Sequence, residues 1–331
     1  NVVFIAVDDM NERLNFLGFP EVLTPNLQRL VNKGMVFTNN YCQQPICNPS
    51  RTSFMSSWRP DKTKVTTNNN DPAVKVPAGV RYLQEHLHYY GYRTERYGKV
   101  YHGDFEYEFS WDYAEGSGGN GGDKPGSVEG QQYPGASWGI FPTDDTFAVD
   151  YLQTESFVSR LKQGLTQPSF LMLGLSTHNP FVPSIENWDI YGDPTKKERL
   201  PIWDLPNKIS GNSSRNFTLP NTPVNDRDDI PSLAFFSGNT IIETDEDWKN
   251  LIHAYYGEVS QLDKCLGVVF DEFDRQNLWS NTIVVFTSDH GQHLGEHNGV
   301  WLKNTLFNES LHVPLVIYVP GKNPGTTNKL T

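Results

Sequence analysis

The sequence has 331 residues, of which 37% are hydrophobic and 20% are charged, and this composition excludes wholesale disorder. Its 27 basic and 39 acidic residues leave a net charge of −12, so we expect no nucleic-acid partner. No apolar run reaches the roughly 18 residues of a membrane-spanning helix, so we also expect no membrane span. The aromatic content of 13% suits both core packing and contacts with sugar rings.

The first residues and the cysteines bear on the compartment in which the protein works. The chain opens directly on an apolar segment at 2–7 and shows no signal peptide, as expected of a processed or a trimmed chain. Three cysteines, Cys42, Cys47 and Cys265, are too few for a disulfide framework. Their odd number leaves at least one unpaired thiol, or one cysteine that is no longer a thiol.

Apolar patterning predicts strands that alternate with helices. Residues 2–7 read VVFIAV, a continuous apolar run typical of a strand buried on both faces of a parallel sheet. Residues 281–291 carry the strongest strand pattern of the chain. In chain order, the patterns predict strand 2–7, helix 24–34, strand 35–37, helix 79–90, strand 92–97, helix 147–163, strand 169–176, helix 246–276, strand 281–291 and a last strand 313–321.

Two long segments interrupt this alternation. Residues 103–145 are rich in Gly, aromatic and acidic residues without clear periodicity, and residues 183–245 are rich in Pro, Asn and Asp. We expect both to be loop insertions. The alternation of strands and helices predicts a single α/β domain over residues 1–331, with a doubly wound, mostly parallel or mixed sheet and helices on both faces.

Ligand-type side chains follow two of the predicted buried strands. Asp8 and Asp9 end the first strand, and Asp289 and His290 end the strand of 281–291. If the two strands are neighbours, the four side chains converge at one sheet edge, where α/β proteins place their ligands. Oxygen-rich sites suit hard divalent cations, so we expect Ca²⁺, with Mg²⁺ as the alternative. For Asp8 and Asp9 alone, a helix cap or a solvated turn is the competing interpretation.

A second group of reactive residue types lies at 47–51. Cys47-Asn-Pro-Ser-Arg51 places a thiol, a hydroxyl and a fixed cation close together, and we expect Pro49 to enforce a turn there. A single cysteine is most often a small buried hydrophobe. The surrounding residues favour a reactive role for Cys47 instead.

Taken together, these motifs resemble those of a known enzyme family. Cys-x-Pro-Ser-Arg at 47–51, VDD at 7–9 and SDHG at 288–291 resemble, in the expected order, the type I sulfatases of the alkaline phosphatase-like superfamily. The segments PSRTSFMSSWRPD, GYRTERYGKVYHG and VVFTSDHGQHLGEHNGVWLKN are similar to the iduronate-2-sulfatase-like branch. The resemblance implies an alkaline phosphatase-like fold and the oxidation of Cys47 to formylglycine, whose hydrate is the nucleophile. It also implies a formylglycine-generating maturation enzyme as a partner.

The resemblance extends the candidate site to further residues. It implies that Arg51 holds the nucleophile, that Lys99 and Lys303 bind the sulfate group, and that His102 assists the nucleophile. His178 is implied to bind the substrate and to protonate the leaving sugar oxygen. Without the family, solvated or turn positions are the simpler interpretations for these lysines and histidines. The metal ligands implied by the resemblance are those of the two strand ends, Asp8, Asp9, Asp289 and His290.

Some features depart from the family pattern. Ser56-Ser57 stands where the family usually has Thr-Gly, and THNPF surrounds His178 in place of the setting of the closest branch. The acceptor sugar is therefore expected to differ. Sulfatases continue into a smaller C-terminal subdomain, which we expect to be missing from this chain or to be a separate fragment. The family implies a periplasmic or secreted location, or a lysosomal one in a eukaryote.

The leading functional prediction is a sulfatase that hydrolyses sulfate esters on a carbohydrate. Algal polysaccharides such as carrageenan or ulvan and glycosaminoglycans are both open as substrates. The Asn-rich run at 66–71 is predicted to be an exposed loop, and it borders the substrate pocket in the related branch. The alternatives are a phosphonate monoester or phosphodiester hydrolase of the same superfamily, and a sulfated-glycan binder without catalysis.

Overall fold

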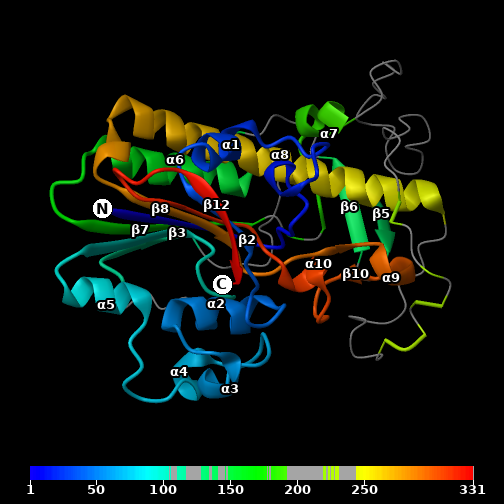
Figure 1. Ribbon diagram of the computed structural model, residues 1–331, viewed down its shortest axis with the longest axis horizontal. Coiled ribbons are helices and arrows are strands. Elements are labelled where there is room, and N and C mark those ends of the chain that lie inside the picture. Colours follow the sequence, from blue (N-terminus) through cyan, green and yellow to red (C-terminus); the bar gives the residue numbers. More distant parts are fainter. Residues whose placement is uncertain are drawn as a thin grey trace.

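A mixed β-sheet forms the centre of the protein in a computed structural model (Figure 1). The structure describes residues 1–103, 105, 110–116, 128–133, 136–140, 146, 148–176, 178, 180–191, 219, 220, 223, 225, 226, 228–230 and 244–330. Within these residues the sheet has eight strands in the order β12-β2-β11-β8-β1-β7-β3-β4. Their bounds are β1 Val2–Val7, β2 Met35–Asn39, β3 Arg93–Gly98, β4 Tyr113–Glu115, β7 Ser169–Leu175, β8 Ile283–Ser288, β11 Leu315–Tyr318 and β12 Gly325–Leu330.

The strands in the middle of the sheet run parallel. β1 pairs in parallel with β7 on one side and with β8 on the other, although residues 7 and 283 are far apart in the chain. β11 is antiparallel to both β8 and β2, which makes the sheet mixed. The predicted mixed α/β sheet is therefore confirmed. All seven residues of β7 are buried, as expected of a strand covered on both faces.

Helices cover both faces of the sheet and complete a three-layer fold (Figure 1). One side carries α1 (Pro25–Val31), α6 (Val149–Lys162) and α8 (Asp245–Arg275). The other carries α2 (Cys47–Ser56), α3 (Pro60–Thr63), α4 (Pro72–Lys75) and α5 (Leu83–Tyr89). Of the helices in the described part of the chain, none is both long enough and apolar enough to cross a bilayer.

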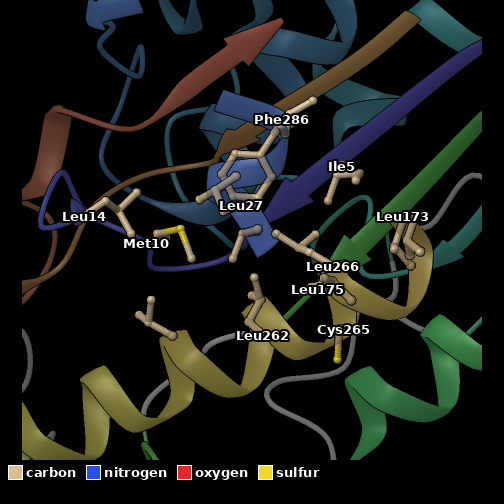
Figure 2. Close-up of a cluster of buried hydrophobic side chains, with 14 of the residues drawn as sticks. Ile5, Met10, Leu14, Leu27, Leu173, Leu175, Leu262, Cys265, Leu266 and Phe286 are labelled. Atoms are coloured by element: carbon tan, nitrogen blue, oxygen red, sulfur yellow. The ribbon is translucent and has the colours of Figure 1, made fainter. Parts of the chain in front are cut away.

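The main hydrophobic core lies between the sheet and α8 (Figure 2). Leu262 and Leu266 of α8 face Ile5 of β1 and Leu175 of β7, and α8 is amphipathic over its 31 residues. Burial of such side chains contributes about 25 cal/mol per Å² of apolar surface, so this face holds α8 against the strands. The packing positions the carboxyl ends of β1, β7 and β8 rigidly.

The N-terminus of α1 is capped by a carboxylate from α8. The side chain of Thr24, at the N-cap position, donates to Asn15 and leaves the first backbone N–H groups of the helix uncapped. Asp263 of α8 accepts hydrogen bonds from the backbone N–H groups of Asn26 (2.9 Å) and Leu27 (2.7 Å). One carboxylate thus joins two helices on the same face of the sheet.

Replacing Asp263 with alanine should destabilise the fold, because it removes the acceptor of the partly buried N–H of Asn26 and of the buried N–H of Leu27. We expect the free energy of unfolding, measured by urea denaturation, to fall by about 1–3 kcal/mol. Asp271→Ala is the matched control on α8, since Asp271 is exposed and its ion pair with Arg29 contributes about 1 kcal/mol or less. Equal losses in the two variants would contradict the capping role.

The structure corrects the prediction that residues 103–145 are one long loop. This segment contains β4, which extends the main sheet, and the antiparallel pair of β5 (Val128–Tyr133) and β6 (Ala136–Ile140). β4 has only three residues, and β5 reads VEGQQY, which lacks an apolar alternation. Strands this short or this polar escape a pattern based on hydrophobic periodicity.

The second predicted insertion also contains regular structure. α7 (Ile185–Tyr191) begins directly after Pro183-Ser184, a helix-start signal that the Pro-rich composition of 183–245 obscures. Trp188 of α7 is buried and stacks on His253 of α8. Most of residues 192–243 lie outside the described residues, so that part of the loop prediction is untested.

Two element boundaries and the conformation at Pro49 also differ from the predictions. The predicted last strand, 313–321, is followed by β12, whose sequence GTTNKL is polar because it forms the edge of the sheet. The helix predicted for 79–90 begins only at Leu83. Pro49 does not form a turn: it lies in the first turn of α2, where its missing N–H costs no helical hydrogen bond.

Candidate active site

The candidate site lies at the carboxyl ends of β1, β7 and β8. Val7 is in register with Ser288, so Asp8 and Asp289 are neighbours immediately beyond the two strands. The backbone N–H of Asp289 donates to the carbonyl of Val7 (3.0 Å), and that of Asp8 donates to Leu175 at the end of β7 (3.0 Å). The sheet pairing therefore continues into the site and holds both carboxylates in place.

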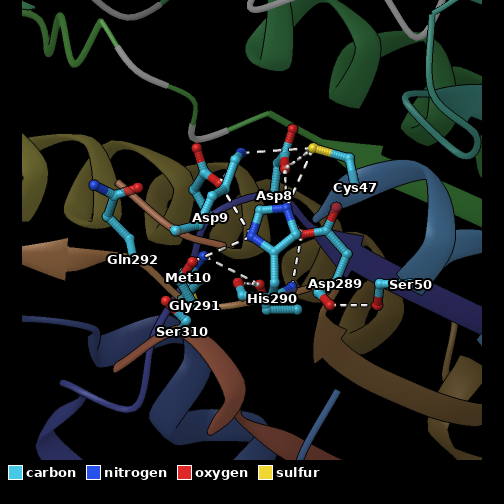
Figure 3. Close-up of polar contacts among 12 residues, drawn as sticks. Asp8, Asp9, Met10, Cys47, Ser50, Asp289, His290, Gly291, Gln292 and Ser310 are labelled. Carbon is cyan, nitrogen blue, oxygen red and sulfur yellow. Dashed lines mark hydrogen bonds and ion pairs between the residues drawn. The ribbon is translucent and has the colours of Figure 1, made fainter. Parts of the chain in front are cut away.

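His290 lies at the centre of the acidic side chains (Figure 3). Its Nδ1 is 3.2 Å from Asp9 Oδ1, and its Nε2 is 3.6 Å from Asp8 Oδ1. Asp9 adopts a left-handed backbone with φ of 57°, which is uncommon for a residue with a side chain. All four residues predicted from the strand ends are buried and meet at one edge of the sheet.

Cys47 lies at the N-terminus of α2 and points into the same group (Figure 3). Its Sγ is 3.2 Å from His290 Nε2 and 3.5 Å from both Asp8 Oδ1 and Lys303 Nζ. Ligand atoms of Asp8, Cys47, Asp289 and His290 all lie within 4.8 Å of one another. The strand ends supply Asp8, Asp9, Asp289 and His290, and Cys47 is a fifth member of this cluster.

The surroundings of Cys47 favour its thiolate. Burial and the Asp8 carboxylate both raise the pKa of the thiol, but the neighbouring cations have the larger combined effect, and the pKa lies well below its usual range. A position in the first turn of a helix acts in the same direction. The cations responsible are Lys303, Lys99 and His290.

Arg51, one turn after Cys47 on α2, is completely buried. Its Nε donates to Asp289 Oδ2 (2.7 Å), and its Nη1 donates to the carbonyl of Lys99 (2.6 Å). Its Nη2 is buried without a hydrogen-bond partner among the described residues. Arg51 therefore joins α2 to the end of β8 and keeps one donor available inside the site.

Two buried lysines reach the same carboxylates from different segments. Lys99, directly after β3, forms an ion pair with Asp8. Lys303, directly after β10 (Trp301–Leu302), lies 2.5 Å from Asp9 Oδ1. Burial raises the pKa of Asp8, but the nearby cations, Lys99 first, bring it well below its usual range. At neutral pH the site holds two charged lysines and the charged Asp8 carboxylate.

Asp289 and His290, which follow β8, both have a raised pKa, whereas the pKa of Asp8 is lowered. Burial raises the pKa of Asp289 to about 6, and the Arg51 guanidinium opposes that rise. Burial lowers the pKa of His290, but the Asp289 carboxylate and the Cys47 thiol outweigh it and bring the pKa to about 9. His290 is therefore an imidazolium cation at neutral pH when no metal ion competes for its nitrogen.

The two other histidines predicted for the site occupy its surroundings. His178 follows β7, and burial and Lys303 lower its pKa, whereas Asp9 and Asp8 raise it, so it lies within electrostatic range of the site. His102 follows β3 and is half-buried, and its Nδ1 has no hydrogen-bond partner among the described residues. No hydrogen bond joins His102 to Cys47 in the described part of the chain.

Gly174 is a residue of the site that the motifs alone do not reveal. A Cβ atom at this position would lie 1.8 Å from the backbone oxygen of Lys99, so only glycine allows β7 to approach Lys99. An isolated glycine within the apolar run of 169–176 is a recognised signal of close backbone approach. That signal was available in the sequence.

Asn48 is a second such residue, and it fixes the Asn-rich loop beside Cys47. Its Nδ2 donates to the carbonyls of Thr67, Asn68 and Asn70 at 2.7–3.3 Å. Its backbone N–H donates to Asn68 Oδ1 (3.0 Å). The exposed loop of 66–71 therefore lies against the start of α2, next to Cys47.

The donor set of the strand-end cluster fits a divalent cation. Asp9 Oδ2 is buried without a hydrogen-bond partner among the described residues, so it is an unsatisfied anionic oxygen inside the cluster. Carboxylate oxygens with one imidazole nitrogen are suitable ligands for a hard cation. The residues that would hold the ion are Asp8, Asp9, Asp289 and His290, together with the side chain at position 47.

Comparison with known proteins points to one family. The family model "Sulfatase" matches residues 1–331. A curated sulfatase of Formosa agariphila is 30% identical over 354 residues, with 98% of this chain and 65% of that protein covered. Human iduronate 2-sulfatase is 29% identical over 360 residues, with 97% of this chain and 60% of that protein covered. The chain thus spans about three fifths to two thirds of the length of these relatives.

The fold agrees with solved structures. A phosphonate monoester hydrolase of Agrobacterium radiobacter superposes with a TM-score of 0.76 at 18% identity, over 100% of this chain and 71% of that one. At this identity the likeness concerns the fold alone. The match of the family model over all 331 residues, together with the 30% identical relative, shows that the chain belongs to the sulfatase family.

Proposed function

We propose that the protein hydrolyses sulfate esters of a carbohydrate, with a formylglycine at position 47 and a divalent cation, most simply Ca²⁺, at the strand ends. The observation that carries this proposal is the place of Cys47 at the start of α2, with its Sγ 3.2–3.5 Å from His290, Asp8 and Lys303. When formed, a formylglycine hydrate supplies two hydroxyl groups on one carbon, one to attack sulfur and one to release sulfate afterwards.

The side chains around position 47 support the binding of a sulfate ester. Lys99 and Lys303 are charged and buried, so they can neutralise an anionic head group in a region of low dielectric constant. The unpartnered Nη2 of Arg51 adds a fixed donor. Asp8 and Asp9 keep both lysines in place before the substrate arrives.

His102 and His178 are proposed to move protons at this centre. His178 follows β7, at the sheet edge that carries Asp8 and Asp289, and we assign it the protonation of the leaving sugar oxygen. His102 follows β3 beside Lys99, and its unpartnered Nδ1 is available to assist the nucleophile. Both assignments rest on position and on the family.

Mass spectrometry of the peptide that contains Cys47 tests the proposal most directly. Conversion to formylglycine lowers the mass by about 18 Da relative to cysteine. We expect this shift in protein produced together with a formylglycine-generating enzyme. An unconverted cysteine in such a sample would instead support a glycan-binding protein without catalysis.

The ester specificity needs a separate test, because phosphonate and phosphodiester hydrolases resemble this chain in Cys-x-Pro-Ser-Arg and in Asp289-His290. We propose a sulfated saccharide as substrate, since iduronate 2-sulfatase is among the relatives and the Asn-rich loop lies beside Cys47. Rates on the sulfate and phosphate monoesters of one sugar should favour the sulfate. A faster phosphate ester would assign the protein to the alternative class.

Removal of the divalent cation should abolish turnover and lower the melting temperature. An ion that binds the strand-end cluster only in the folded state stabilises that state, so its removal should weaken the junction of β1 and β8. Activity and melting temperature are measured after chelation and again after Ca²⁺ or Mg²⁺ is restored. Full activity in a demetallated sample would contradict the metal site.

The cellular setting follows from the same proposal. We propose that residues 1–331 act as one catalytic α/β unit and that a maturation enzyme modifies Cys47. A periplasmic or secreted location, or a lysosomal one in a eukaryote, agrees with the sulfated substrate. Detection of the protein in an extracytoplasmic fraction is the corresponding measurement.

A further inference from the structure

We infer that His293, His297 and Glu309 form a second metal site, suited to a divalent transition-metal ion of the Zn²⁺ type. One ring nitrogen of each histidine and one carboxylate oxygen of Glu309 all lie within 4.8 Å of one another. None of the three belongs to the strand-end cluster. Two imidazoles and one carboxylate are a typical donor set for zinc, whereas Ca²⁺ prefers six to eight oxygen ligands.

The three residues come from neighbouring short elements beyond the strand ends. His293 is in β9 (His293–Leu294), His297 in α9 (Glu296–Gly299) and Glu309 in α10 (Asn308–Leu311). Figure 1 shows α9 and α10 on either side of β10. His297 and the following Asn298 are both left-handed, with φ of 52° and 57°, so the backbone is strained where His297 turns toward the other two.

His293 is fully buried, and its Nδ1 lies 3.7 Å from Glu296 Oε2, beyond hydrogen-bond distance. Its Nε2 lies 2.6 Å from the hydroxyl of Thr305, and that hydroxyl in turn donates to Ser310 (3.0 Å). The hydroxyl hydrogen is therefore engaged, so Thr305 accepts the proton of Nε2. Nδ1 then carries the lone pair; it faces the Glu296 carboxylate and makes no hydrogen bond among the described residues.

In His297 the proton lies on Nδ1 and the lone pair on Nε2, the reverse of His293. Its Nδ1 is 2.8 Å from Asp226 Oδ2, and because a carboxylate only accepts, Nδ1 holds the proton. This is the carboxylate–histidine pattern that orients metal ligands. The lone pair lies on Nε2, which is buried without a hydrogen-bond partner. Phe307 stacks on the imidazole ring, with the two ring centroids 3.7 Å apart, and covers that face of the ring.

The distance from His297 to Glu309 also suits a shared ion. Nε2 of His297 is 3.5 Å from Glu309 Oε2, which is too long for a good hydrogen bond. Two ligands of a tetrahedral zinc ion with bonds of 2.0–2.1 Å are about 3.3 Å apart. In the neutral tautomer, both atoms present lone pairs to each other, and a cation between them removes the repulsion.

Among the described residues, further carboxylates lie close to Glu309. Glu12 has a buried Oε2 without a hydrogen-bond partner, and burial together with the Glu309 and Glu296 carboxylates raises the pKa of Glu12 to about 7. Arg13 forms an ion pair with Glu296. A divalent ion at Glu309 would lower the cost of keeping these carboxylates together.

A metal at this site would act as a brace for the segment that carries His290. The backbone oxygen of Glu309 would lie 2.0 Å from a Cβ atom at Gly291, and the N–H of Gly291 donates to Ser310 (2.8 Å). α10 therefore packs directly on the residue after His290. An ion bound by Glu309, His293 and His297 would hold α10 against the residues that follow His290.

Zinc titration of the whole chain tests the inference. Protein stripped with a chelator is saturated with Ca²⁺, and Zn²⁺ binding is then measured by calorimetry. We expect one tight equivalent in the wild type, a loss of roughly 100-fold or more in affinity for Glu309→Gln and His297→Ala, and roughly 10–100-fold for Asp226→Asn. His88→Ala is the control, since His88 also contacts a carboxylate, Asp112 (3.2 Å), away from this site.

Thermal unfolding gives the second readout. Zn²⁺ should raise the melting temperature of the wild type and of His88→Ala, because an ion that binds only the folded state stabilises it, and should leave Glu309→Gln unchanged. If His297→Ala does not fold, the isosteric Glu309→Gln decides. Absence of saturable zinc binding by the wild type would overturn the site. So would zinc binding that Asp289→Asn abolishes and Glu309→Gln keeps, because the ion then occupies the strand ends.

Discussion

Replacement of Cys47 by alanine should lower the turnover of sulfate esters by roughly 10⁴-fold or more, because it removes the proposed nucleophile. The fold should survive, since the thiol is a small group at the start of α2 and the contacts of Arg51 to Asp289 and Lys99 remain. Turnover is measured with a chromogenic sulfate ester, and folding by circular dichroism.

Two further variants separate the chemistry from the packing. Cys47→Ser should also be poor, because a serine ester of sulfate has no second hydroxyl on the same carbon to expel the sulfate. Cys42→Ala is the control, as Cys42 is a free cysteine whose Sγ contacts the carbonyl of Ser310 (3.7 Å). A Cys47→Ser protein with wild-type turnover would refute the formylglycine mechanism.

Replacement of His178 by alanine should discriminate between leaving groups. A sugar alkoxide is a poor leaving group and needs a proton, so we expect a loss of about 10²–10⁴-fold on a sugar sulfate. A nitrophenolate leaves readily, so the loss on an activated aryl sulfate should be much smaller. The ratio of the two losses is the measured quantity.

The matched comparison for His178 is a residue proposed to bind the sulfate itself. Lys99→Ala and Lys303→Ala should impair both substrates alike, because the sulfate group is common to them. The lowered pKa of His178 adds a pH test: a general acid must be protonated, so turnover of the sugar sulfate should fall as the pH rises past that pKa. Equal losses on both substrates for His178→Ala would leave His178 as a binding contact only.

The central strands could be predicted because the apolar pattern of each one lies within a few consecutive residues. β1, β7 and β8 are continuous apolar runs, and the side chains that end β1 and β8 are visible directly in the sequence. The order of these strands in the sheet could not be predicted from such local patterns. The placement of β1 between β7 and β8 depends on packing between segments nearly a chain length apart, which no local window contains.

The rest of the candidate site escaped prediction for physical reasons as well. Asn48 and Thr305 act through hydrogen bonds to distant loops and histidines, and neither is unusual in its own window. The roles of Lys99 and Lys303 follow from the family resemblance alone and not from any pattern of polarity. The short strand β4 and the edge strand β12 lack apolar alternation because each is only partly covered.

The long separation between β1 and β8 has a consequence during synthesis. Cys47 contacts His290 and Lys303 in the folded protein, so this cluster cannot form until about residue 303 has left the ribosome. At a synthesis rate of roughly 5–20 residues per second, the 47–303 stretch takes on the order of 10–50 s. Over that interval the Cys47 segment is an accessible chain, whereas in the folded protein the same thiol is 1% exposed. An enzyme that modifies Cys47 as proposed would therefore meet it as a nascent peptide, before the completed fold buries it.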